Sequence, residues 1–84
     1  MEWTVVLAGP ARKSLDKIPA GDRKRILAAL GEMQQNPFQG DIRKLQGLPG
    51  FRTRVGSWRI LFELALERRH VVVNAIERRT STTY

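Results

Sequence analysis

The segment Phe51-Arg-Thr-Arg-Val-Gly-Ser-Trp-Arg-Ile-Leu-Phe-Glu-Leu64 contains two runs of alternating side chains separated by Gly56-Ser57. Alternation of this kind is typical of β-strands, and a two-residue Gly-Ser link between such runs is typical of a tight hairpin. The segment therefore predicts two antiparallel strands, Phe51–Val55 and Trp58–Leu64, joined by a two-residue turn.

The predicted turn also decides which side chains share a face of the sheet. With Gly56 and Ser57 in the turn, Arg54 pairs with Arg59, and directly paired residues lie on the same face. Arg52 joins them, because side chains alternate along a strand. The opposite face then carries the apolar side chains that would pack against the helices: Phe51, Val55, Trp58, Ile60 and Phe62.

Three arginines on one sheet face carry an energetic cost, because like charges directly opposite each other destabilise a sheet. Arg52, Arg54 and Arg59 therefore indicate a surface that binds the phosphate backbone of a nucleic acid. The alternative is that the three side chains simply extend into water.

The N-terminal half supplies one strand and two helices. Residues 3–7 alternate and are rich in β-branched side chains, which predicts a strand. A helix is expected from Gly9-Pro10 to about Ile18, because proline is tolerated in the first turn. A second helix is expected from Asp22, as its N-cap, to Asn36-Pro37. Its apolar stripe comprises Ile26, Leu27, Leu30 and Met33.

The remaining segments complete an α+β fold. Residues 38–50 are rich in glycine and predict a loop with little regular structure. His70 to about Glu77 is the last predicted strand, and its triple valine, Val71–Val73, is typical of a central strand buried on both faces. The order β-α-α-β-β-β predicts a four-stranded, mostly antiparallel sheet with a helical hairpin on one face. We expect residues 1–84 to form a single domain.

Composition excludes several classes of protein. The 84 residues include no cysteine and one histidine, His70, which excludes disulfides and thiolate metal sites and argues against a multi-histidine metal centre. No apolar run approaches the ~20 residues that span a membrane. The start, Met1-Glu2-Trp3, lacks the pattern of a signal peptide. We therefore expect a cytoplasmic protein without membrane contact.

Positive charge is concentrated in the C-terminal half. The chain has 15 Lys and Arg against 8 Asp and Glu, and residues 43–84 carry nine basic and three acidic side chains. Eight of these nine basic residues are arginine, whose planar guanidinium binds phosphate bidentately. The charge favours a nucleic-acid partner. The alternative is a highly soluble surface with an acidic protein partner.

The segment 51–64 resembles the hallmark segment of the RelE/ParE toxins of bacterial and archaeal toxin–antitoxin pairs. Lys44-Leu-Gln-Gly-Leu-Pro-Gly50 is similar to the "K-L-x-G" loop of that family, and Val71–Arg79 followed by a tyrosine resembles its last strand. The resemblance covers essentially the whole chain. It implies the RelE-like microbial ribonuclease fold.

Two activities occur in this family. RelE-like members are ribosome-dependent endoribonucleases that cut mRNA in the A site, whereas ParE-like members inhibit DNA gyrase. The RelE-like pattern has two basic residues on one strand, an arginine on the next, an arginine ending the last strand and a tyrosine about six residues later. The resemblance thus implies a RelE-like toxin with the catalytic residues Arg52, Arg54, Arg59, Arg78 and Tyr84. Further RNA contacts are expected from Arg43, Lys44 and Arg79, the last also being the neighbouring candidate for the role of Arg78.

The resemblance also implies a mechanism and partners. The 2′-hydroxyl of the mRNA attacks the adjacent phosphorus without a metal or cofactor. The best-known family pattern has lysines where this chain has Arg52 and Arg54, and arginine keeps its proton at neutral pH, so neither is suited to act as general base. The implied partners are the ribosome, mRNA and an antitoxin with an acidic, partly disordered segment. Two alternatives are a gyrase inhibitor and a non-catalytic nucleic-acid-binding module.

Overall fold

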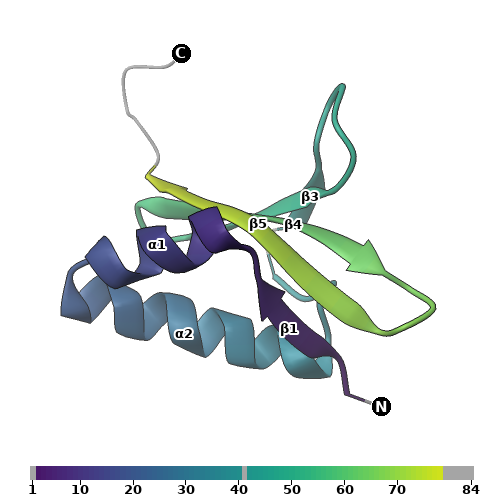
Figure 1. Cartoon of the computed structure of the whole chain (residues 1–84), viewed down its shortest axis with the longest axis horizontal. Helices are drawn as coiled ribbons and strands as arrows, with labels where there is room; N and C mark the ends of the chain where they lie inside the picture. Colours follow the sequence, from purple (N-terminus) through teal and green to yellow (C-terminus); the bar gives the residue numbers. More distant parts are fainter. Residues whose placement is uncertain (1, 41, 79–84) are drawn as a thin grey trace.

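The computed structural model describes residues 2–40 and 42–78. Its strands form a single five-stranded sheet in the order β1-β5-β4-β3-β2, and both helices lie on one side of it (Figure 1). The predicted α+β class, with helices on one face of the sheet, is confirmed. In chain order the elements are β1 (Thr4–Leu7), α1 (Gly9–Lys17), α2 (Ala20–Gln35), β2 (Ile42–Lys44), β3 (Phe51–Val55), β4 (Trp58–Ala65) and β5 (His70–Arg78).

The sheet has one strand more than the four predicted. Ile42–Lys44 pair antiparallel with Phe51–Thr53, so the prediction of a loop throughout residues 38–50 was wrong for this short segment. Three residues are too few to show a period of two, and the glycine-rich connection that follows obscures the strand. The other pairings are antiparallel except that of β1 with β5, which is parallel.

The hydrophobic core lies between the helices and the sheet. Ile60 and Phe62 on β4 are almost fully buried there, and burial of each such side chain contributes about 1.5–3 kcal/mol. The predicted helical stripe is confirmed except at Leu27, which is 49% exposed. The other buried apolar residues are Ala11, Leu15, Ile18, Ile26, Leu30, Met33, Val71, Val73 and Ile76.

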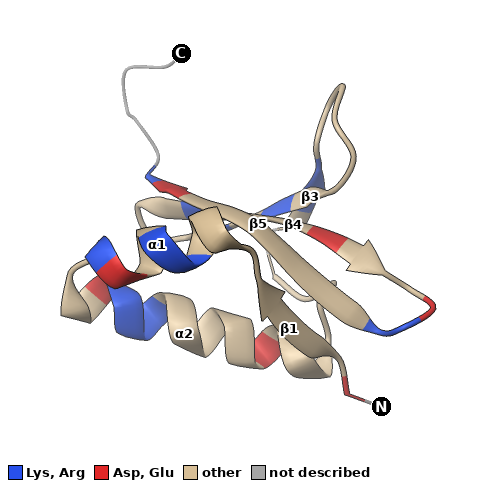
Figure 2. Ribbon diagram, in the orientation of Figure 1, with Lys and Arg blue, Asp and Glu red and all other residues tan. Residues whose placement is uncertain are grey.

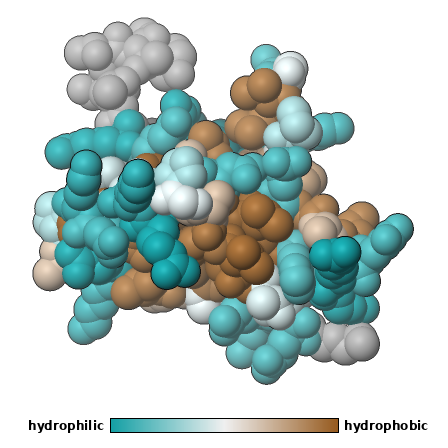
Figure 3. Space-filling model, in the orientation of Figure 1, coloured by the Kyte–Doolittle hydropathy of each residue, from teal (hydrophilic) through white to brown (hydrophobic). Residues whose placement is uncertain are grey.

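The helix-covered side still exposes part of its apolar surface. Apolar side chains gather near the centre of the space-filling view, between α1 and β1, and hydrophilic side chains surround them (Figure 3). A chain of 84 residues has too little polar surface to cover its core completely. Among the described residues, no helix combines the length and the apolar character needed to cross a membrane.

Helix α2 begins earlier than predicted. Pro19 is its N-cap and makes no side-chain capping bond, so the prediction of Asp22 as N-cap was wrong. Asp22 lies in the first turn instead, where its Oδ2 accepts a hydrogen bond of 3.1 Å from the indole Nε1 of Trp58. This bond ties the start of α2 to the start of β4.

A β-bulge interrupts the pairing of β4 with β5. Leu61 pairs with Ala75 and Phe62 pairs with Val73, which leaves Asn74 as the extra residue on β5. A bulge of this kind reverses the alternation of the residues that follow it. Val71 and Val73 therefore point toward the helices before the bulge, and even-numbered residues do so after it.

The prediction that Val71–Val73 form a central strand buried on both faces is only partly correct. Strand β5 lies inside the sheet, between β1 and β4, which confirms an internal strand. Val71 and Val73 are fully buried against the helices, whereas Val72 is half-buried on the face without helices.

Gly50, at the base of the β2–β3 connection, is required by geometry. Its φ is +106°, and a Cβ at this position would lie 2.7 Å from the carbonyl oxygen of Phe62. We expect Gly50→Ala to lower the free energy of unfolding by about 2 kcal/mol or more, because strain and a backbone clash combine. Gly47→Ala is the matched control: φ is +74° there, but the space is open, so a cost of about 1 kcal/mol is expected. Urea denaturation measures both, and equal losses would contradict the clash.

Candidate nucleic-acid interface

The side of the sheet without helices carries four arginines from three adjacent strands. Arg54 lies directly opposite Arg59, as the hairpin predicted, and Arg43 on β2 lies directly opposite Arg52. We call this surface, defined by Arg43, Arg52, Arg54 and Arg59, the arginine face. Figure 2 marks basic positions along β3 and β4 in blue.

Sheet geometry sets the spacing of these groups. Paired residues have Cβ atoms about 4.5–5.5 Å apart, and residues two apart on a strand are separated by about 6.5–7 Å. The arginine face therefore consists of two adjacent rows, Arg43–Arg52 and Arg54–Arg59. Long side chains from such positions can converge on a single phosphate group or on two consecutive ones, and the fork of a guanidinium suits each of them.

An acidic side chain extends one of these rows. Glu77 on β5 lies directly opposite Arg59, and its Oε1 is 3.3 Å from Nη2 of Arg59. The two side chains are 47% and 39% exposed, so the ion pair remains open to solvent. The Nε of Arg59 is buried and has no hydrogen-bond partner among the described residues. The sequence did not predict Glu77 on this face. The pattern of apolar and polar residues along β5 does not reveal the bulge that brings Glu77 there.

A second acidic residue on this face is engaged elsewhere. Oε2 of Glu63 accepts a hydrogen bond of 2.8 Å from Nδ2 of Asn74, the bulge residue. Glu63 lies four residues further along β4 than Arg59, a distance of about 13 Å along an extended strand. The carboxylate of Glu63 therefore stabilises the bulge rather than the arginine pair.

Not every predicted site residue belongs to the arginine face. Arg78 lies opposite Trp58, with its guanidinium carbon 5.9 Å from the centroid of the indole ring, and this places it on the helix side of the sheet. Lys44 lies opposite Phe51 and is on that side too. The structure thus brings together Arg43, Arg52, Arg54 and Arg59 but not Arg78 or Lys44. Arg79 and Tyr84 lie outside the described residues.

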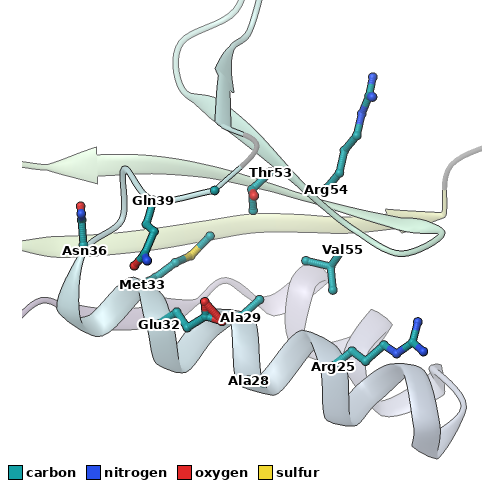
Figure 4. Close-up of a pocket in the computed structure, with 11 residues that line it drawn as sticks. Arg25, Ala28, Ala29, Glu32, Met33, Asn36, Gln39, Thr53, Arg54 and Val55 are labelled. Atoms are coloured by element: carbon teal, nitrogen blue, oxygen red, sulfur yellow. The ribbon is translucent and has the colours of Figure 1, made fainter.

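A separate cleft of about 380 Å³ lies between α2 and β3. The close-up shows Thr53 and Val55 directed toward it and the Arg54 side chain pointing away (Figure 4). The cleft and the arginine face therefore lie on opposite sides of β3, and Arg54 is the one residue that belongs to both sets. Within the described ranges, no group of three or more His, Cys, Asp or Glu side chains is placed to hold a metal ion. The cleft is lined by Arg25, Ala28, Ala29, Glu32, Met33, Asn36, Gln39, Gly40, Thr53, Arg54 and Val55.

Comparison with known proteins identifies the fold. No protein-family model and no curated protein matches the sequence, but solved structures match the backbone. The RelBE2 toxin–antitoxin complex of Mycobacterium tuberculosis gives a TM-score of 0.84 at 23% identity, covering 94% of this chain and 100% of that one. The chain has the fold of the RelE toxins.

Two archaeal structures agree with this assignment. The RelE–RelB complex of Pyrococcus horikoshii gives a TM-score of 0.82 at 19% identity, covering 98% of this chain and 100% of that one. The RelB–RelE complex of Methanococcus jannaschii gives 0.72 at 26% identity, covering 87% and 88%. The resemblance to RelE toxins in the sequence is thus confirmed at the level of the RelE fold.

The arginine face predicts a salt dependence for RNA binding. Each phosphate contact to a single strand contributes about −0.7 to the slope of log Kobs against log salt concentration. We expect Arg43→Ala and Arg52→Ala each to reduce the magnitude of this slope by about 0.7, measured by fluorescence anisotropy with a single-stranded RNA. Lys13→Ala, an exposed basic residue on α1, is the control and should leave the slope unchanged. Equal effects of all three variants would show that binding follows net charge alone.

Proposed function

We propose that this protein is the toxin of a type II toxin–antitoxin system and that it cuts mRNA in the ribosomal A site. The observation that carries the proposal is the direct pairing of Arg54 with Arg59 on an open sheet face, beside the Arg43–Arg52 pair. Such pairs reduce the stability of a sheet, so a role in binding polyanions accounts for them better than a structural role. The RelE fold supports the same reading.

The proposed reaction is a transesterification within the RNA. The 2′-hydroxyl attacks the adjacent phosphorus, leaving a 2′,3′-cyclic phosphate and a 5′-hydroxyl. Arg59 stabilises the charge that grows on the phosphoryl oxygens, and one preorganised contact of this kind is worth about 3–4 kcal/mol. Arg52 and Arg54 hold the backbone. Tyr84, which lies outside the described residues, stacks on a base or exchanges a proton.

In this proposal, Arg78 does not contact the phosphate. Its pairing with Trp58 directs it to the helix side of the sheet, away from Arg59. We assign it a role in packing at the end of β5, where a cation over an indole ring contributes about 0.5–1 kcal/mol.

The ribosome has a clear physical role in this proposal. The arginine face is an open surface rather than a deep pocket, so the protein alone fixes the RNA poorly. A ribosome that holds mRNA in a defined geometry supplies the orientation that an enzyme normally obtains from its own cavity. The proposed site of action is therefore the cytoplasm, where translating ribosomes are found.

The proposed protein partner is an antitoxin. The structural neighbours include RelE chains bound to RelB antitoxins, and residues 43–84 of this chain carry nine basic and three acidic side chains. An antitoxin with an acidic, disordered segment would be attracted to this half of the chain, and complementary charge speeds association.

The proposed function is tested by primer extension on mRNA in a reconstituted translation system. We expect cuts within codons that appear only when ribosomes and this protein are both present. Inhibition of DNA supercoiling by purified gyrase, with mRNA left intact, would favour a gyrase inhibitor instead. RNA binding without any cleavage would indicate a non-catalytic module.

Two variants in the same assay compare an arginine on the arginine face with one on the helix side of the sheet. We expect Arg59→Ala to lower the cleavage rate about 100-fold to 1000-fold, because it removes a contact to the developing charge. Arg78→Ala removes the same charge from the other face, and its rate should fall by less than about tenfold. The cleavage rate on ribosome-bound mRNA measures both, and a larger loss for Arg78→Ala would reverse the assignment.

A further inference from the structure

The proposed reaction needs a group that removes the proton from the attacking 2′-hydroxyl, and the arginines of the arginine face are unsuited to this role. A guanidinium has only donor N–H groups and stays charged in proteins. We propose that Glu77 is the general base of this site. This inference rests on the proposed function and assigns it a further catalytic residue.

The fold brings Glu77 to the arginine face through the bulge at Asn74. Strict alternation from the buried Val71 and Val73 would direct Glu77 toward the helices. The extra residue shifts the register, so that Ala75 pairs with Leu61 and Glu77 pairs with Arg59. Bulges that re-aim a side chain are over-represented next to active sites.

The position of Glu77 within the face fits the role. Arg54, Arg59 and Glu77 form one row across β3, β4 and β5, with the carboxylate 3.3 Å from a guanidinium nitrogen of Arg59. A phosphate bound by Arg54 and Arg59 therefore has a carboxylate at its side, where a neighbouring ribose hydroxyl can reach it. Both members of the ion pair are exposed enough for RNA to approach them.

The other titratable groups on this face do not fit as well. Glu63 lies about 13 Å from Arg59 along β4, and its carboxylate holds Asn74. His70 begins β5, seven residues before Glu77, which is about 23 Å away along an extended strand. Of the described residues, Glu77 is the group able to accept a proton that lies beside the arginine pair.

The ion pair adds little to the stability of the sheet. Exposed pairs of this kind contribute about 0–1 kcal/mol to stability. Besides its buried Nε, Arg59 has N–H donors on two terminal nitrogens, so it can hold the carboxylate through Nη2 and still contact a phosphoryl oxygen. The pair thus orients the base and is retained when the substrate binds.

The proposed step balances as follows. The Glu77 carboxylate takes the proton of the 2′-hydroxyl while the 2′-oxygen forms a bond to phosphorus. The bond from phosphorus to the 5′-oxygen breaks, and the leaving oxygen takes a proton from a water molecule. Glu77 then releases its proton to solvent, which returns it to the carboxylate form.

The test compares Glu77→Gln with the wild-type protein and with Glu63→Gln. The second variant removes a negative charge from the same face but keeps a side-chain oxygen that can accept the hydrogen bond from Asn74. Single-turnover cleavage is measured on ribosome-bound mRNA at saturating protein, together with the protein concentration that gives half the maximal rate. Thermal unfolding of each variant establishes that it folds. We expect Glu77→Gln to lose about 100-fold or more in rate, within the usual contribution of a general base.

Three further results are expected. The half-maximal concentration for Glu77→Gln stays the same or falls, because a negative charge near the RNA is gone. Glu63→Gln keeps its rate within about threefold of wild type. The residual rate of Glu77→Gln rises about tenfold per pH unit, because hydroxide then takes the place of the missing base.

The outcomes separate this inference from the proposed function. Cleavage by the wild type with an equal or higher rate for Glu77→Gln would overturn Glu77 as the base and leave the endoribonuclease intact. Equal losses of rate in Glu77→Gln and Glu63→Gln would show that removing any negative charge from this face lowers the rate. That result would also overturn Glu77 as the base. No cleavage by the wild type would remove the proposed function, and this inference with it.

Discussion

The register of β3 against β4 determines the face that every side chain of this hairpin occupies. Gly56 takes a φ of +58°, the positive value that the first residue of a type II′ turn requires, and Val55 thereby lies opposite Trp58. A shift of one residue would expose Ile60 and Phe62 to water. The arginines occupy the opposite face because these apolar residues must occupy theirs.

The magnitudes explain why the fold tolerates this concentration of charge. Like charges directly opposite each other cost a few tenths of a kcal/mol to about 1 kcal/mol, whereas burial of Phe62 and Ile60 contributes about 1.5–3 kcal/mol each. Repulsion between Arg54 and Arg59 is therefore too weak to change the register. The ion pair of Arg59 with Glu77 offsets part of that repulsion. The helix side supplies the stability, and the open side can carry charges that a stability requirement alone would not select.

The sequence predicts the parts of this fold in which a segment is long enough to show the periodicity of a helix or a strand. The hairpin and its register follow from Gly56-Ser57, and both helices follow from their periodicity. Strand β2 was not predictable, because its three residues gain their conformation from pairing with β3 rather than from their own pattern. Asp22 has the chemistry of an N-cap, but a tertiary bond to Trp58 uses its carboxylate.

The candidate site shows the same division. The grouping of Arg52, Arg54 and Arg59 follows from alternation within one hairpin, so the sequence is sufficient to predict it. The faces of Arg78 and Glu77 depend on the bulge at Asn74, and a bulge is a property of two paired strands that neither strand reveals alone. One extra residue on β5 therefore separates Arg78 from the arginine face and brings Glu77 beside Arg59.

The openness of the arginine face limits what it can do in isolation. Electrostatic stabilisation of a developing charge is strongest where water is excluded, yet Arg59 and Glu77 are 39% and 47% exposed. In the proposed reaction these groups reach their full effect only when a second surface covers them and holds the RNA in place. A ribosome with mRNA in its A site meets both requirements at once. A small domain without a cavity of its own is therefore suited to a substrate that arrives already oriented and enclosed, and it would act weakly on free RNA.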